Sequence, residues 1–210
     1  MFQRCFFAVP LAVTAVVLGV AGCSRPSHST TDASAPSPSV PSPAPNPVPA
    51  PAPVPTGKST SDMAPEFPDG AEWVQGGPLR LDDLRGRVVV LHFWTNGCSN
   101  CIHNYPVYRE WQQTYAKKDI TLIGVHTPEF AWEAPAEKVR SKARENGLTF
   151  PIVLDRNNTI WAAWSNRYWP AIYLIDKRGG VRHRWEGELH LDTREGKQFA
   201  AHIDELLAER

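Results

Sequence analysis

A dense run of β-branched and aromatic residues at positions 88–94 leads almost directly into the pair Cys98-x-x-Cys101. Such a run is typical of a strand that is buried on both faces. A helix is expected to begin at the cysteine pair and to continue to about Tyr115, with a kink at Pro106. The sequence therefore predicts that both cysteines lie where a central strand ends and a helix begins.

The rest of this region alternates between strand and helix patterns. Strands are expected at residues 79–81, 120–126, 151–154, 171–175 and 181–185, and helices at residues 136–146 and 159–165. A last helix should begin near Asp192, with Glu195 completing a capping box and an apolar stripe formed by Phe199, Ile203, Leu206 and Leu207. This alternation predicts one α/β domain over residues 65–210.

The first 23 residues have the pattern of an export signal. Arg4 is the only charged residue before an apolar stretch that ends in Val20-Ala21-Gly22-Cys23. The small residues before a cysteine resemble the lipobox of bacterial lipoproteins, which implies a signal peptide at residues 1–22 and a lipid on Cys23. We therefore expect an exported chain that this lipid holds on a bacterial membrane, facing the periplasm or the cell exterior. An ordinary signal peptide and an uncleaved anchor are the alternatives.

Residues 23–64 form a segment rich in proline, serine and alanine, with ten prolines between residues 36 and 55. Such a segment cannot pack a core and favours extended polyproline II structure. We interpret it as a lipid-anchored linker that holds the folded domain away from the membrane. The alternative is a segment whose length has no function.

Cysteine usage leaves only one pair available for a disulfide within the mature chain. Of the four cysteines, Cys5 would leave with the signal peptide and Cys23 would carry the lipid. Export places Cys98 and Cys101 where disulfides persist. Because a disulfide that closes so short a loop restrains the unfolded chain little, a redox role is favoured over a structural one.

The position of each cysteine on the expected helix predicts its chemical role. The thiolate is the reactive form, and a helix N-terminus stabilises it. Cys98 is expected to attack a partner, and Cys101, one turn inside the helix, to resolve the mixed disulfide. A zinc site would need further ligands, covalent haem a histidine in place of Ile102, and a peroxidatic cysteine a proline in place of Leu91. No metal ion or cofactor is expected.

Three separated motifs carry a resemblance to a known family. They are Phe93-Trp94-Thr95-x-x-Cys98-x-x-Cys101 with Pro106, Val-His-Thr-Pro-Glu-Phe at residues 125–130, and Asn-Arg-Tyr-Trp-Pro-Ala-x-Tyr-Leu-Ile-Asp at residues 166–176. They resemble the membrane-anchored thioredoxin-like oxidoreductases of the TlpA/ResA type, especially the redoxin domain of the DipZ-like subgroup. The resemblance implies an α/β, thioredoxin-like fold: a central mixed β-sheet flanked by helices, with an N-terminal strand extension and an inserted helix.

The resemblance also implies roles for residues outside the cysteine pair. Pro170 matches the cis-proline that faces the cysteines and holds the backbone open for an extended peptide; an ordinary trans proline is the alternative. Glu129 matches an acidic residue near the active site, a candidate to carry the proton of Cys101; a solvated loop carboxylate is the alternative. Trp94, Thr95 and Trp169 are candidates for a substrate groove, with core packing as the alternative for the two tryptophans.

His92 is a departure from the thioredoxin pattern. It lies six residues before Cys98, where thioredoxins keep a buried acid beneath the disulfide. His92 is therefore a candidate proton acceptor, although a core histidine with satisfied hydrogen bonds is the favoured interpretation. This departure shifts the expected proton chemistry towards Glu129.

These observations predict a lipid-anchored, extracytoplasmic thiol–disulfide oxidoreductase that reduces protein disulfides. The expected partners are oxidised or reduced protein thiols and a membrane electron donor of the CcdA/DsbD type. We expect a monomer. Nucleic acid is not expected as a partner, because 22 basic residues balance 22 acidic ones. The alternatives are a peptide-binding module whose disulfide does not turn over, and a copper chaperone that uses both cysteines and His126.

Overall fold

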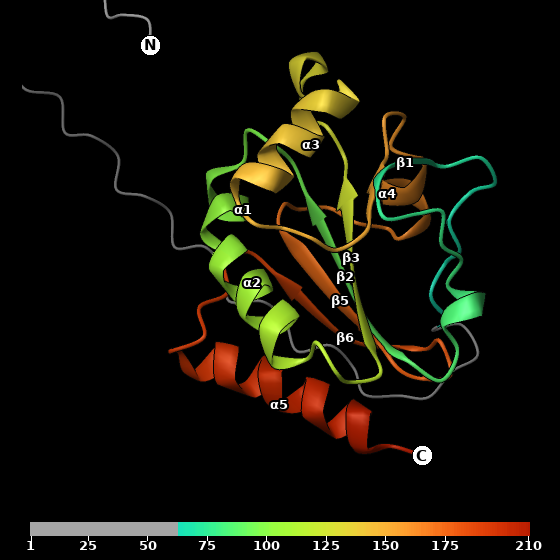
Figure 1. Ribbon diagram of the computed structural model, residues 1–210, viewed down its shortest axis with the longest axis vertical. Helices are drawn as coiled ribbons and strands as arrows, with labels where there is room; N and C mark the ends of the chain where they lie inside the picture. Colours follow the sequence, from blue (N-terminus) through green and yellow to red (C-terminus); the bar gives the residue numbers. More distant parts are fainter. Residues whose placement is uncertain (1–62) are drawn as a thin grey trace, which may run out of the picture. The chain divides into compact units, whose positions relative to one another are not determined.

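A computed structural model describes residues 63–210 of the chain, which form one mixed β-sheet covered by helices (Figure 1). The six strands have the order β1-β4-β3-β2-β5-β6. β2, β3 and β4 are parallel, while β1, β5 and β6 run antiparallel to their neighbours. The strands are β1 (Glu72–Gln75), β2 (Val88–Trp94), β3 (Ile120–His126), β4 (Ile152–Leu154), β5 (Ala171–Ile175) and β6 (Val181–Glu186).

The helices cover both faces of this sheet. They are α1 (Ser99–His103), α2 (Tyr105–Thr114), α3 (Ala136–Glu145), α4 (Thr159–Ala163) and α5 (Arg194–Ala208), with short 3₁₀ turns η2 (Asp82–Leu84) and η3 (Ala131–Glu133). One face packs against α1, α2, α3 and α5, and the other packs against α4 and the segment before β2 (Figure 1). This arrangement is the expected thioredoxin-like fold, with β1 as the N-terminal strand extension and α3 as the inserted helix.

The central position of β2 follows from its sequence. All seven of its side chains are buried, because β3 and β5 flank the strand and helices cover both of its faces. Trp94 at the end of β2 pairs with His126 at the end of β3, and Phe93 pairs with Ala171 at the start of β5. The segments that follow β2 and β3 and the segment that precedes β5 therefore lie at one end of the sheet.

Most of the expected elements are present, and the differences concern element boundaries and one strand. Residues 79–81 form no strand, although Leu81 packs into the core. The strand on this side is β1, and of its four residues only Val74 is buried. A strand so short and so exposed lacks the apolar alternation by which strands are recognised.

The helix after the cysteines is interrupted, as the proline in its sequence predicts. α1 ends before Asn104, and α2 begins there with Pro106 in its first turn, where a missing backbone N–H does not matter. The start of α5 differs from the expectation: Thr193 is the N-cap and accepts a hydrogen bond from the Gly196 N–H at 3.1 Å, so Asp192 is not the cap.

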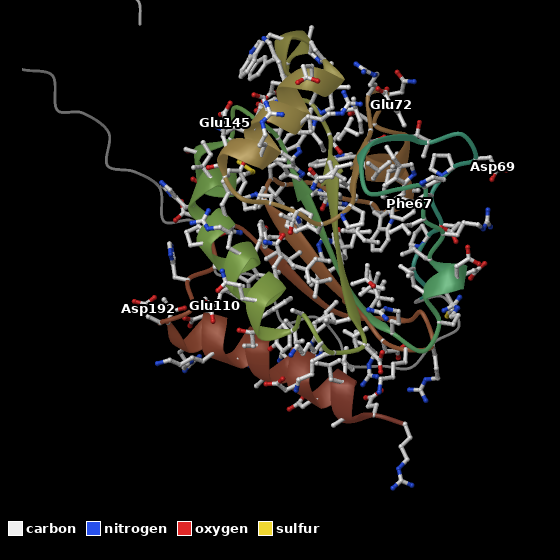
Figure 2. All side chains as sticks on the ribbon, viewed as in Figure 1. Phe67, Asp69, Glu72, Glu110, Glu145 and Asp192 are labelled. Carbon is white, nitrogen blue, oxygen red and sulfur yellow. A yellow bond between two sulfur atoms is a disulfide. The ribbon has the colours of Figure 1, made fainter. Side chains whose placement is uncertain are left out.

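The segment before β2 packs on the face opposite α2. The Phe67 ring is buried and lies edge-to-face against Trp73, with ring centroids 5.3 Å apart, whereas Asp69 points to solvent (Figure 2). The predicted signal peptide, the lipid on Cys23 and nearly all of the proline-rich linker lie outside the described residues. Within residues 63–210, no helix is long and apolar enough to cross a membrane.

Candidate active site

Cys98 and Cys101 form a disulfide at the end of β2, after the turn Thr95-Asn96-Gly97. Their Cα atoms are 5.2 Å apart. Cys98 is the N-cap of α1, and its Sγ accepts a hydrogen bond from the Cys101 backbone N–H at 3.1 Å. The two cysteines differ in accessibility: Cys98 is half-buried, whereas Cys101, in the first turn of α1, is fully buried.

Pro170 lies at the same end of the sheet. It directly precedes Ala171, the residue of β5 that pairs with Phe93, and the Trp169–Pro170 peptide bond is cis. The Pro170 carbonyl accepts a hydrogen bond from the Gly187 N–H at 2.8 Å, which fixes the entry into β5. The cis bond is the one that the resemblance implies. Its role in holding the backbone open for a peptide stays a prediction.

Two of the three residues expected in a substrate groove are inaccessible. Trp94 is fully buried and makes edge-to-face contacts with Tyr105 and His126. Thr95 is also fully buried. The expectation that these two residues line a groove is therefore wrong, because neither side chain is accessible. The side chain of Trp94 points into the core on the same face of β2 as that of His92. Only Trp169 is partly exposed, and its ring packs on Trp161 at 4.1 Å.

His92 is a core residue, but its hydrogen bonds are not satisfied. Its ring stacks on Tyr108 at a centroid distance of 4.0 Å and meets Phe150 edge-to-face. Neither ring nitrogen has a hydrogen-bond partner within the described part of the chain. Burial lowers the pKa of His92 to about 3, so the ring is neutral at physiological pH.

The buried carboxylate near the cysteines belongs to Glu133, not to Glu129. Glu129 is exposed, which corrects the expectation that it lies against the thiols, and the solvated-loop alternative describes it. The Glu133 side chain is fully buried in η3. Its carboxylate accepts hydrogen bonds from the backbone N–H of Gly97, and from those of Glu129 and Phe130 at 2.8 Å each.

These hydrogen bonds keep Glu133 ionised. Burial alone would raise its pKa, but the N–H groups of Phe130, Gly97 and Glu129 outweigh burial and hold the pKa below its ordinary value. Glu133 caps the start of η3 by accepting the N–H of Phe130, the N-cap residue. Because a phenylalanine has no acceptor for the other half of a capping box, the sequence pattern does not mark Glu133.

His126 completes the buried polar groups at this end of the sheet. It is fully buried, neither of its ring nitrogens has a partner among residues 63–210, and burial lowers its pKa to about 4. In the same part of the chain, no three side chains of His, Cys, Asp or Glu are grouped so that they could hold a metal ion.

A disulfide at the end of the central strand, with one accessible sulfur and a cis-proline before the adjacent strand, is the arrangement typical of thiol–disulfide oxidoreductases of thioredoxin-like fold. The chain belongs to the AhpC/TSA family, whose model matches residues 60–184. ResA, a thiol-disulfide oxidoreductase of Geobacillus thermodenitrificans, is 33% identical over 127 residues, which are 60% of this chain and 69% of ResA. This relationship confirms the resemblance drawn from the three motifs.

Two further similarities agree with this assignment. Protein DipZ of Mycobacterium tuberculosis is 45% identical over 111 residues, which are 53% of this chain but only 16% of DipZ, so the chain spans a small part of that relative. The crystal structure of a thiol-disulfide isomerase from Corynebacterium glutamicum superposes with a TM-score of 0.60 at 25% identity, covering 70% of this chain and 98% of the isomerase.

Proposed function

We propose that this chain is an extracytoplasmic, lipid-anchored reductant of protein disulfides, in which Cys98 attacks and Cys101 resolves. The observation that carries the proposal is the unequal burial of the two cysteines. Cys98 is half-buried at the surface, whereas Cys101 is fully buried behind it. A partner disulfide therefore reaches Cys98 first, and only a sulfur already joined to Cys98 comes within reach of Cys101.

The exchange proceeds in two steps. The Cys98 thiolate attacks one sulfur of the partner disulfide; a Cys98–partner bond forms, the partner S–S bond breaks, and one partner thiolate leaves. The Cys101 thiolate then attacks Cys98, the Cys98–Cys101 bond forms, and the second partner thiolate leaves. Two electrons pass to the partner, whose two thiolates take up protons at neutral pH.

A negative charge beside Cys98 supports the reducing direction. Glu133 is a buried anion that is hydrogen-bonded to the N–H of Gly97, the residue directly before Cys98. A nearby negative charge disfavours a thiolate. Because a couple is oxidising when its reduced form is stabilised, an anion at this position makes the couple more reducing.

Continued turnover requires an electron source. Each cycle leaves the Cys98–Cys101 disulfide, and residues 63–210 contain no further cysteine that could reduce it. We assign the source to a membrane electron-transfer protein of the CcdA/DsbD kind, as the family resemblance implies. A lipid on Cys23 followed by a proline-rich linker would keep the domain near such a donor while letting it reach soluble partners.

Stopped-flow reduction of a model disulfide by the wild type and by Cys98→Ser tests this proposal. The wild type should react rapidly, and the Cys98→Ser variant should lose nearly all of the rate, because Cys101 is buried. Equal rates would contradict catalysis and would favour a binding module with an inert disulfide.

A further inference from the structure

Among residues 63–210, four of the five exposed large apolar side chains belong to segments at the end of the sheet that carries the disulfide. The five are Met63, Ile102, Phe130, Trp132 and Tyr168. All but Met63 belong to α1, to the segment after β3, or to the segment before Pro170. These three segments lie at the end of the sheet that carries Cys98. An apolar surface next to a reactive group marks an interaction site.

Phe130 and Trp132 form the most exposed part of this surface, and we call the two residues the aromatic lip. Their rings are stacked nearly parallel, with an interplanar angle of 9° and centroids 6.4 Å apart. About half of each side chain is accessible, 53% for Phe130 and 52% for Trp132. So large an apolar surface is costly to leave in water unless a partner covers it.

The aromatic lip is held at a fixed position relative to the cysteines. Trp132 packs against Gly97: a Cβ atom at Gly97 would lie 3.1 Å from Cζ2 of the indole. Glu133 joins the two segments, because the same carboxylate accepts the N–H groups of Gly97 and of Phe130. These contacts therefore hold the aromatic lip in a fixed position beside the residue that precedes Cys98.

The geometry of the mixed disulfide determines which part of the partner contacts the aromatic lip. A mixed disulfide brings the two cysteine Cα atoms to within roughly 4.4–6.8 Å. The neighbouring residue of the partner then lies about one Cα–Cα step, about 3.8 Å, further along its chain. Because Trp132 contacts Gly97, a side chain flanking the partner cysteine reaches the lip while the mixed disulfide exists.

The apolar rings of the lip favour an apolar occupant. The Lys138 ammonium lies 5.5 Å from the centroid of the Trp132 ring, and the exposed Glu129 directly precedes Phe130, so charges of both signs flank the lip. An aliphatic or aromatic side chain would bury more apolar area against the two rings than a serine or lysine side chain would.

We propose that the aromatic lip selects partners, favouring an extended protein segment that carries an apolar side chain directly beside its reacting cysteine. This inference rests on the proposed function, since it concerns the choice of disulfide that Cys98 attacks. The lip residues are specificity determinants and take no part in electron transfer.

Three peptide disulfides test the proposal against the reduced full chain. Each is a cysteine peptide joined to thionitrobenzoate, with Phe, Ser or Lys beside the cysteine, and oxidised mercaptoethanol serves as the small reference disulfide. We expect the wild type to react about tenfold faster with the Phe peptide than with the Ser peptide or the Lys peptide. Phe130→Ala and Trp132→Ala should each lose most of this preference when rates are expressed relative to oxidised mercaptoethanol.

Met63→Ala is the matched control, because Met63 is 46% exposed but pairs with Gly180 at the other end of the sheet. It should keep the full preference for the Phe peptide. The proposal is overturned if the wild type shows no preference, if both lip variants keep it, or if the lip instead mediates a concentration-dependent dimer that Trp132→Ala abolishes. Failure of the wild type to react with any disulfide, oxidised mercaptoethanol included, would overturn the proposed function itself and the lip proposal with it.

Discussion

The carboxylate of Glu133 accepts a hydrogen bond from the backbone N–H of Gly97, the residue directly before Cys98. Through this contact, a buried anion on the segment after β3 is fixed beside the reactive cysteine. The same carboxylate binds the N–H groups of Glu129 and Phe130, so one side chain sets both the charge at the redox centre and the position of the aromatic lip.

Glu133→Gln should make the Cys98–Cys101 couple less reducing. Removing the anion stabilises the Cys98 thiolate, and with it the reduced form. In equilibration with a thiol–disulfide buffer, we expect the equilibrium constant to change about tenfold in favour of the dithiol. This corresponds to a reduction potential that is higher by about 30 mV. The matched control is Glu129→Gln, because Glu129 is exposed and contributes only its backbone N–H to the site. A potential that is unchanged, or that becomes more negative, would remove the basis for the reducing direction.

Glu133 also predicts how stability depends on pH. Its folded pKa lies below the ordinary value of 4.5, so its contribution to the free energy of unfolding is fully present above pH 4.5. That contribution should be lost as the pH falls through the lower folded pKa. Chemical denaturation at several acidic pH values should show a steeper loss for the wild type than for Glu133→Gln. Parallel curves would show that Glu133 is not held ionised by the fold.

His92→Phe should flatten a different part of the stability curve. Burial lowers the pKa of His92 from 6.5 to about 3, so the unfolded chain binds a proton in this window that the folded chain does not. The contribution of His92 to the free energy of unfolding is fully present above pH 6.5 and is lost as the pH falls towards 3. In His92→Phe the aromatic ring should still stack on Tyr108, but the free energy of unfolding should no longer fall with pH between 6.5 and 3. A variant at the exposed His190 should keep this pH dependence.

The same His92 variant distinguishes a core residue from a proton acceptor. A ring that stays neutral throughout the physiological range carries no proton during exchange. The pH profile of disulfide reduction should therefore have the same shape in His92→Phe and in the wild type. Loss of an inflection near neutral pH would restore His92 as the proton acceptor of Cys101.

The turn before Cys98 requires a glycine. A Cβ at Gly97 would lie 2.9 Å from Glu133 Oε1, closer than Cβ atoms approach in real structures, and 3.1 Å from Trp132, which is a tight contact. Gly97→Ala should displace η3, lower the free energy of unfolding by about 1–3 kcal/mol and slow reduction of the Phe peptide. Gly180→Ala is the control, since a Cβ there meets Asp176 at an ordinary 3.5 Å. Equal stability and rate in the two variants would show that the turn tolerates a side chain.

Much of this fold could be predicted from sequence because its central strands are continuous apolar runs. The bounds of β3 and β5 were predicted to the residue, since both strands are almost wholly buried and turn residues border them. β1 was missed because three of its four side chains are not buried, so its pairing with β4 depends on tertiary context.

The active site likewise contains residues that the sequence predicts and residues whose role depends on the tertiary structure. Cys98 and Cys101 follow from a short motif whose spacing reflects local geometry, and Pro170 follows from the family resemblance. Glu133 was missed, and Glu129 chosen, because the burial of a carboxylate depends on the turn that folds η3 back onto Gly97. Trp94 packs in the core, as the alternative interpretation describes, because strand alternation puts its side chain on the same helix-covered face of β2 as those of Val88 and Val90.

Mass spectrometry of trapped mixed disulfides tests the central claim, the division of labour between Cys98 and Cys101, most directly. Each single Cys→Ser variant of the full chain would be reduced and mixed with an excess of a disulfide-bonded protein substrate. Cys101→Ser should accumulate one partner molecule per chain, linked through Cys98, because nothing resolves the intermediate. Cys98→Ser should accumulate almost none, since Cys101 is fully buried. Equal trapping by the two variants, or trapping only through Cys101, would contradict the account.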